Sequence, residues 1–135
     1  MNKKEVVQVP IKDVMDDKGR RAVPLSRAIK ANGFVFVSGI PPYDPQTSRL
    51  VGGGIEAQTR RVLENLRITL QAAGSSLECV VKTTVFCSNA AYFTDINEIY
   101  REYFPQEPPT RTFVTVGSWP GKFDIEIEAI ALADG

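Results

Sequence analysis

The sequence predicts an α+β fold in which two amphipathic helices pack on one face of a mixed β-sheet. Apolar residues recur at helical spacing in two separate segments, and the other apolar segments are rich in Val, Ile, Phe and Thr, as strands are. The predicted order is strand, strand, helix, strand, helix, strand, strand. With 135 residues, the chain has the size of one domain, which we expect to span residues 1–135.

The first half of the chain is predicted to form two strands and a helix. Asn32-Gly33 favours a two-residue hairpin turn between a strand over residues 27–30 and one over residues 34–38. The second of these strands is apolar on both faces, so we expect both faces to be buried. Helical spacing then runs over residues 55–73, and Gly74 is suited to end the helix.

The second half is predicted to form a strand, a helix and two further strands, over residues 77–87, 92–104, 111–117 and 123–133. The last strand alternates: residues such as Ile125 and Ile127 suit a face covered by helices, whereas the opposite face ends in Ile130 and Leu132. A chain of this size has no third layer to cover that second face. We therefore expect a homo-oligomer whose helix-free sheet face is turned inward.

Composition excludes several classes of function. Sixteen basic and sixteen acidic residues give a net charge of zero, whereas proteins that bind nucleic acid usually carry a basic excess. The chain has no histidine, which excludes Ser-His-Asp and Cys-His catalysis and His-ligated zinc. We therefore do not expect nucleic acid as a partner. We do not expect a membrane either, because no apolar run approaches the ~18 residues that span a bilayer. The N-terminus lacks the apolar core of a secretory signal, so a cytoplasmic protein is expected.

Arg111 and Glu126 are the residues best suited to chemistry. If their strands were antiparallel neighbours, both side chains would project from the helix-free face, with Arg111 and Phe113 on that face and Val114 on the helix-packed one. An Arg fork is suited to bind a substrate carboxylate, and a partly desolvated Glu can move protons near neutral pH. The alternative is an ordinary ion pair, either between strands or between subunits.

Three further residues are candidates on weaker grounds. Ser38-Gly39, at the end of a predicted strand, could present a backbone N–H to a ligand, although strand-end geometry explains it equally well. Asn97 lies inside a predicted helix, where Asn is mildly unfavourable, so a specific hydrogen bond is expected to keep it there.

Several motifs together resemble the RidA family, also called the YjgF family, from about residue 20 to 133. They are Phe-Val-Phe-Val-Ser-Gly at 34–39, Ala-Gln-Thr at 57–59, Ala-Gly-Ser-Ser-Leu at 73–77, Val-Lys-Thr-Thr-Val-Phe at 81–86, Pro-Thr-Arg-Thr at 109–112 and Ile-Glu-Ile-Glu-Ala-Ile-Ala at 125–131. The resemblance implies a chorismate-mutase-like α+β fold, assembled as a homotrimer with three clefts between subunits. It implies no metal and no organic cofactor.

The activity that the resemblance implies is hydrolysis of reactive enamines and imines, such as 2-aminoacrylate, to a 2-oxo acid and ammonia. By its motifs, Arg111 would bind the carboxylate of such a small substrate, and Glu126 would position the hydrolytic water. Ser38, Gly39 and Asn97 would line the cleft.

Two residues depart from the family pattern. Leu25 stands where the family usually has Tyr, and Phe113 where the best-studied deaminases have Cys, so the pocket is expected to be more apolar. These departures concern the substrate more than the hydrolysis. A 2-aminomuconate-type deaminase of aromatic catabolism would suit a larger, apolar pocket. A non-catalytic trimeric ligand-binding protein that keeps the Arg as an anion site is the other alternative, and Leu25 favours it.

Overall fold

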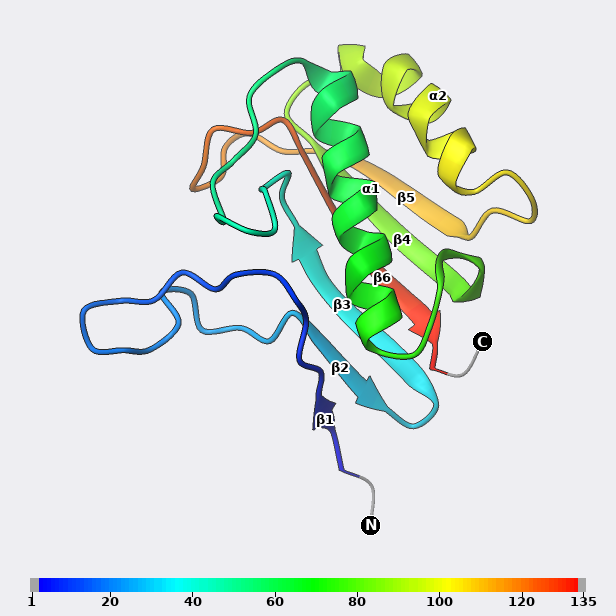
Figure 1. The fold of residues 1–135 in the computed structure, drawn as a ribbon. Helices are drawn as coiled ribbons and strands as arrows, with labels where there is room; N and C mark the ends of the chain where they lie inside the picture. Colours follow the sequence, from blue (N-terminus) through cyan, green and yellow to red (C-terminus); the bar gives the residue numbers. More distant parts are fainter. Residues whose placement is uncertain (1–2, 134–135) are drawn as a thin grey trace.

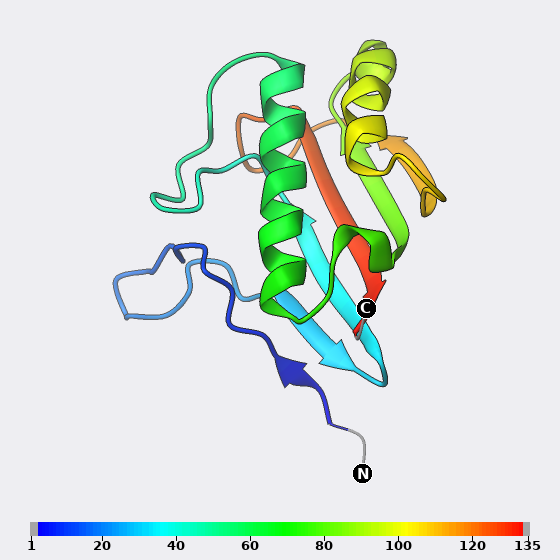
Figure 2. The same ribbon diagram turned by 45° about the vertical axis from the view of Figure 1, so that its right-hand side comes forward.

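The computed structural model describes residues 3–133 and shows a six-stranded sheet with two helices, α1 (Ile55–Ala72) and α2 (Phe93–Tyr103) (Figure 1). The outermost two residues at each end of the predicted domain lie outside this range. Both helices cover the same face of the sheet, which confirms the predicted α+β class (Figure 2). The strands are β1 (Glu5–Val6), β2 (Ala28–Ala31), β3 (Phe34–Ile40), β4 (Val80–Cys87), β5 (Thr110–Thr115) and β6 (Ile125–Leu132).

The strand order is β1-β2-β3-β6-β4-β5, with β4 and β5 parallel and all other neighbours antiparallel. The assumption that β5 and β6 are neighbours is therefore wrong. Helix α2 carries the chain from β4 back to the start of β5, so these two strands run side by side as in a β-α-β unit. The chain then crosses the end of β4, and β6 enters between β4 and β3.

The core lies between the helices and the sheet. On α1, the side chains of Val62, Leu63, Leu66 and Leu70 are fully buried, which confirms the predicted helical stripe. They face Val35 and other buried strand residues. Gly74, at φ 75°, follows the helix end in the left-handed conformation that favours glycine.

The hairpin between β2 and β3 is confirmed, because Asn32 and Gly33 adopt the positive φ angles, 51° and 83°, that its turn requires. The expected burial of both faces of β3 is wrong in the single chain. Phe34 and Phe36 remain 36% and 43% exposed on the helix-free face. Their partners on β6 across that face are Leu132 and Ile130. We call these four residues the apolar sheet face.

The remaining elements differ little from expectation. Residues 77–79 form a 3₁₀ turn, so β4 begins at Val80 rather than at Leu77. Asn89 accepts a hydrogen bond at Oδ1 from the backbone N–H of Ala91 and caps the turn before α2. Strand β1 is too short to leave a pattern in the sequence. Cys79 and Cys87 are free thiols. In the described part of the chain, no helix is long and apolar enough to cross a membrane.

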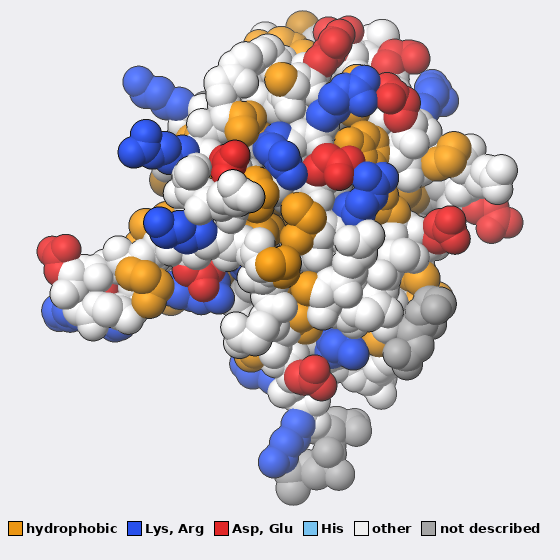
Figure 3. Space-filling view, viewed as in Figure 1, with side chains coloured by type: hydrophobic (Ala, Val, Ile, Leu, Met, Phe, Trp, Pro, Cys, Tyr) orange, Lys and Arg blue, Asp and Glu red, His pale blue; other side chains and the backbone are white. Residues whose placement is uncertain are grey.

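Residues 12–25, which we call the arm, stand out from the body of the molecule (Figure 3). A bridge between Met15 and Arg21 closes the arm on itself. At its base, Arg27 donates from Nε to Asp13 at 3.1 Å and from Nη2 to the carbonyl of Lys12 at 3.1 Å. The arm is therefore fixed to the start of β2.

Candidate active site

Glu126 projects from the helix-free face of β6, between the buried residues Ile125 and Ile127. Burial raises the pKa of its carboxyl group, and the nearby charge of Glu128 raises that pKa further. A Cβ atom on Gly39 would lie 2.8 Å from Glu126 Cδ and 3.0 Å from Oε1. Glycine at this position therefore lets the carboxyl group lie directly against the backbone of β3.

A cavity of about 330 Å³ adjoins Glu126 and also contacts Leu25, Ser38 and Gly39. The structure thus brings together four of the predicted site residues. Ser38 does not point freely into the cavity, because its Oγ donates to the carbonyl of Ser26 at 2.7 Å. The arm forms one wall, and the connection between β5 and β6 forms another, with Trp119 and Phe123 among the lining residues.

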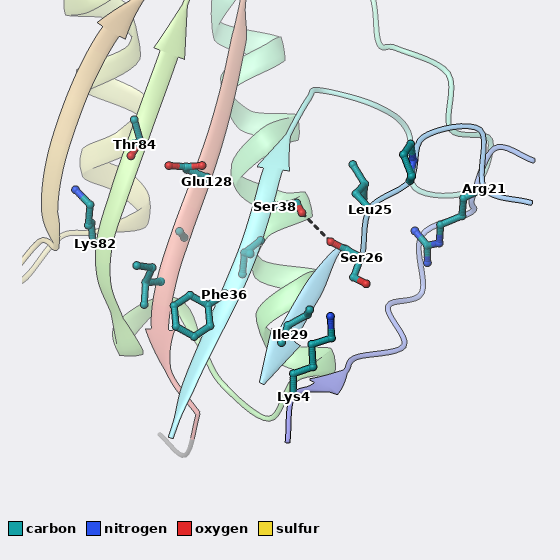
Figure 4. Close-up of a pocket in the computed structure, with 14 residues that line it drawn as sticks. Lys4, Arg21, Leu25, Ser26, Ile29, Phe36, Ser38, Lys82, Thr84 and Glu128 are labelled. Atoms are coloured by element: carbon teal, nitrogen blue, oxygen red, sulfur yellow. Dashed lines mark hydrogen bonds between the residues drawn. The ribbon is translucent and has the colours of Figure 1, made fainter. Parts of the chain in front are cut away.

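A second, larger hollow of about 900 Å³ lies on the helix-free face and shares Arg21, Leu25 and Ser38 with the cavity at Glu126. Figure 4 shows Leu25 and the Ser38–Ser26 hydrogen bond on one side of this hollow, and Lys82 and Glu128 on the other. Leu25 therefore lies where the cavity adjoins the open sheet face.

Arg111 lies on the other face of the sheet. In the parallel register, Arg111 pairs with Thr83, whose hydroxyl hydrogen-bonds Tyr100 of α2 at 2.7 Å, so both side chains point to the helices. The guanidinium carbon lies 4.9 Å from the ring centre of Tyr100, 5.7 Å from that of Phe93 and 5.8 Å from that of Phe113. Among residues 3–133, no carboxylate pairs with Arg111. The guanidinium makes cation–π contacts with these aromatic rings, and its N–H groups remain available to bind an anion.

The predicted faces of β5 are therefore wrong. Phe113 packs edge-on against Phe93, with ring centres 4.9 Å apart, on the helix side of the strand. Val114, which was expected to face the helices, is 37% exposed. Both faces of this edge strand carry apolar residues, so alternation alone did not distinguish them.

Asn97 lies on the same side as Arg111. Both line a hollow of about 590 Å³ between α2 and the segment of Pro108 and Pro109. Within the described residues the Asn97 side chain forms no hydrogen bond, so the bond expected to hold it in the helix is not found inside one chain.

The predicted site residues thus form two groups, separated by the sheet. Glu126, Ser38, Gly39 and Leu25 lie on the helix-free side, whereas Arg111, Phe113 and Asn97 lie beside α2. Strand β4 separates β5 from β6, and neighbouring strands are about 4.8 Å apart. Arg111 and Glu126 therefore form no cross-strand ion pair, and one chain does not bring them to the same small ligand.

A set of side-chain hydrogen bonds around Asp124, which we call the clamp, fixes the start of β6, two residues before Glu126. Gln58 of α1 donates from Nε2 to Asp124 Oδ2 at 2.9 Å and accepts the backbone N–H of Asp124 at 2.7 Å. Ser88 donates to the other carboxylate oxygen at 2.7 Å. Sequence reasoning missed this clamp, because nothing local links a polar residue on a helix to one 66 positions away.

Sequence reasoning also missed Tyr43 and Arg27 beside the cavity. Burial raises the pKa of the Tyr43 hydroxyl, which accepts a hydrogen bond from Arg27 Nη1. The signal available was an aromatic residue in the Pro-rich turn after β3. Across residues 3–133, no three Cys, Asp or Glu side chains gather as metal ligands would.

Comparison with known proteins identifies the family of the chain. Residues 17–133 match the family model described as Endoribonuclease L-PSP. A RutC family protein from Pyrococcus horikoshii is 48% identical over 108 residues, which make up 80% of this chain and 86% of that protein. The chloroplastic Reactive Intermediate Deaminase A from Arabidopsis thaliana is 44% identical over 108 residues, 80% of this chain and 58% of the longer plant protein.

Solved structures also resemble this chain. The crystal structure of E. coli TdcF with bound serine matches with a TM-score of 0.83 at 30% identity, over 95% of this chain and 98% of that one. The chain belongs to the Endoribonuclease L-PSP family, which is the YjgF/RidA family that its motifs resemble.

Proposed function

We propose that the protein is a deaminase that hydrolyses reactive imines and enamines of 2-amino acids to 2-oxo acids and ammonia. The observation that carries this proposal is Glu126, an acid whose pKa is raised by burial and whose carboxyl group borders a cavity. The name of the Arabidopsis relative, Reactive Intermediate Deaminase A, supports the same reaction class.

The chemistry requires one group that first accepts and then donates a proton. Water adds to the carbon of the protonated imine and gives a carbinolamine, and the proton that water loses passes to the carboxylate. The same proton then returns to the nitrogen. The C–N bond breaks, ammonia leaves, and the carbinolamine hydroxyl gives its proton to the carboxylate as the C=O bond forms. A carboxyl group with a raised pKa suits both steps, because its pKa lies closer to neutral pH than that of an ordinary carboxyl group.

Arg111 is proposed to hold the substrate carboxylate. Its guanidinium has no acidic partner among the described residues and is oriented by Tyr100, Phe93 and Phe113. A planar fork with parallel N–H groups fixes both the position and the rotation of a carboxylate. The imine carbon next to that carboxylate would then be directed toward the water at Glu126.

This reaction needs at least two copies of the chain, because Arg111 and Glu126 lie on opposite sides of one sheet. We propose a homotrimer in which Arg111 of one copy faces Glu126 of the next, with the substrate in the cleft between them. The apolar sheet face supports self-association, since it exposes two phenylalanines and a leucine in the single chain.

A mixing experiment tests the shared site. Arg111→Ala and Glu126→Gln are each expected to lack activity alone, measured as ammonia release from 2-aminoacrylate supplied by a dehydratase. Co-refolding them in equal amounts should restore about a quarter of the parent activity. Each interface takes Arg111 from one copy and Glu126 from the next, and in a random mixture about one interface in four receives both intact residues. Each variant refolded alone is the control. A mixture as inactive as its components would contradict a site shared between copies.

The same assay separates the deaminase from a non-catalytic ligand-binding trimer. If the parent protein does not accelerate ammonia release but still binds a 2-oxo acid through Arg111, the binding function is the better account. Leu25, at the mouth of the cavity, is the residue that favours that alternative.

A further inference from the structure

Two separate segments of the chain line the cavity at Glu126, the arm and the connection between β5 and β6. Val14, Val23 and Leu25 line it from the arm, and they remain 58%, 60% and 41% exposed. Trp119 and Phe123 line it from the β5–β6 connection, and their rings stack with centres 4.4 Å apart and planes 28° apart. Apolar residues from both segments thus line a space beside the proposed base.

The polar groups on these walls already have partners. Trp119 Nε1 donates to the carbonyl of Phe123 at 2.7 Å, which turns the indole N–H away from a guest. Tyr43 accepts from Arg27. The other lining hydroxyl and charged side chains bond to protein groups: Ser38 to Ser26, Ser48 to Lys12, Thr69 to Asn65, and Asp13 to Arg21 and Arg27. Among the described lining residues, only Glu126 offers a free polar side chain.

The volume of the cavity also bears on its occupant. At about 330 Å³ it falls within the range of small-molecule sites. A water molecule occupies about 30 Å³, and a methyl group has a similar size. A substrate side chain as small as methyl would leave most of this apolar space unfilled, whereas a branched or aromatic side chain would bury the exposed arm residues.

We infer that this cavity is the side-chain subsite of the enzyme and that it selects imines of amino acids with large apolar side chains. The substrate carbon chain would lie between the arm and the Trp119–Phe123 stack, with its imine carbon at Glu126. Trp119 would act as a specificity residue that contacts the substrate side chain. The inference rests on the proposed function, which it deepens by naming the substrate class.

The test compares imines made in place by an L-amino-acid oxidase from leucine, phenylalanine and alanine. Protein is added with semicarbazide, which traps the remaining imine, and the loss of trapped product reports kcat/KM. We expect kcat/KM for the leucine and phenylalanine imines to exceed that for the alanine imine at least about tenfold, the discrimination that one or more methylenes give in an apolar pocket.

Variants of the wall assign the preference to the cavity. Trp119→Ala should reduce the ratio of large to small substrate to less than about threefold, chiefly by lowering kcat/KM for the large imines. Trp119→Phe should retain most of the preference, because an aromatic ring still stacks on Phe123. Met15→Ala is the matched control, since Met15 lies on the arm and is 54% exposed but does not line the cavity.

The outcomes distinguish the two levels of the proposal. Acceleration of all imines with equal ratios, or a preference for the alanine imine, overturns the inference and leaves the deaminase intact. No acceleration of any imine overturns the proposed function. A preference for large imines that Trp119→Ala leaves unchanged shows that the side chain binds elsewhere, which also overturns the inference.

Discussion

At the scale of single residues, Glu126 depends on a residue without a side chain. Gly39 has no Cβ, and the Glu126 carboxyl group occupies the space that a Cβ would need. Only the flexible end of Glu126 would have to move if a methyl group were added. A substitution at Gly39 therefore acts on the position of the carboxylate more than on the fold.

Gly39→Ala is expected to lower kcat by about a hundredfold, the effect that a displacement of about 1 Å can have on an aligned group. The melting temperature should change little. Gly52→Ala is the control, because a Cβ there meets nothing within 4 Å. Unchanged turnover in Gly39→Ala would show that the position of the Glu126 carboxylate does not limit the reaction.

The raised pKa of Glu126 predicts a pH-dependent cost in stability. The folded protein holds the proton of this group to a higher pH than the unfolded chain does, whose pKa is near 4.5. As pH rises from 4.5 through the raised folded pKa, the free energy of unfolding therefore falls. Glu126→Gln removes this titration, so its melting temperature should exceed that of the parent at neutral pH. The difference should vanish below about pH 4.5 and would have the opposite sign if Glu126 were stabilised as a carboxylate.

Arg111→Lys keeps the positive charge and loses the planar fork. Charge-assisted hydrogen bonds contribute roughly 1.5–3 kcal/mol each, so loss of one should lower kcat/KM by about ten- to a hundredfold. Calorimetry with a 2-oxo acid product measures the anchor directly and should show a matching loss of affinity. If the lysine variant binds the product as tightly as the parent, Arg111 is not the anchor.

At the scale of elements, helix α1 places strand β6 through side-chain hydrogen bonds as well as through apolar packing. Gln58 is 5% exposed and contacts both the backbone N–H and the carboxylate of Asp124. Glu126 follows two residues later on the same strand. The clamp therefore fixes the position of Asp124 just before β6. Through the strand, it also helps to position Glu126 at the cavity.

Gln58→Leu is expected to lower the free energy of unfolding by about 1–3 kcal/mol, because it leaves polar groups of Asp124 without partners in a partly buried place. Turnover should fall as well, while binding of a 2-oxo acid at Arg111 should persist. Arg60→Ala on the same helix is the control, since Arg60 forms only an exposed pair with Glu102. Full activity in a destabilised Gln58→Leu variant would limit the clamp to a role in stability.

At the scale of the whole molecule, the sheet has one covered face and one open face. The open face is apolar where Phe34 and Phe36 pair with Leu132 and Ile130. The proposed site needs two copies for a separate reason, the placement of Arg111 and Glu126 on opposite sides. Both observations favour self-association of the chain.

The family resemblance implies three copies, so sedimentation equilibrium should show a trimer at micromolar concentration. Phe36→Lys places a charge on the apolar sheet face and is expected to give monomers without deaminase activity. Gln71→Lys, on the exposed side of α1, is the matched control and should remain trimeric. A parent protein that sediments as a monomer would contradict both the assembly and the shared site.

The sequence by itself determined the features that short-range rules control. Positive φ at Asn32 and Gly33, the buried stripe of α1 and the alternation of β6 follow from neighbouring residues alone, so they were predicted correctly. The side of the sheet on which Glu126 lies was predictable for the same reason. Buried apolar residues alternate with more exposed residues along its strand, so the apolar face is the one that packs against the helices.

Only the tertiary structure decided where Arg111 lies and which strands are neighbours. A strand order depends on long-range pairing, and the position of β6 between β3 and β4 leaves no mark on any local pattern. The face of β5 was ambiguous, because Phe113 and Val114 are both apolar and side-chain direction reverses at each residue. The cavity beside Glu126 likewise arises from the arm and the Trp119–Phe123 stack, which are far apart in sequence and meet only in the folded chain.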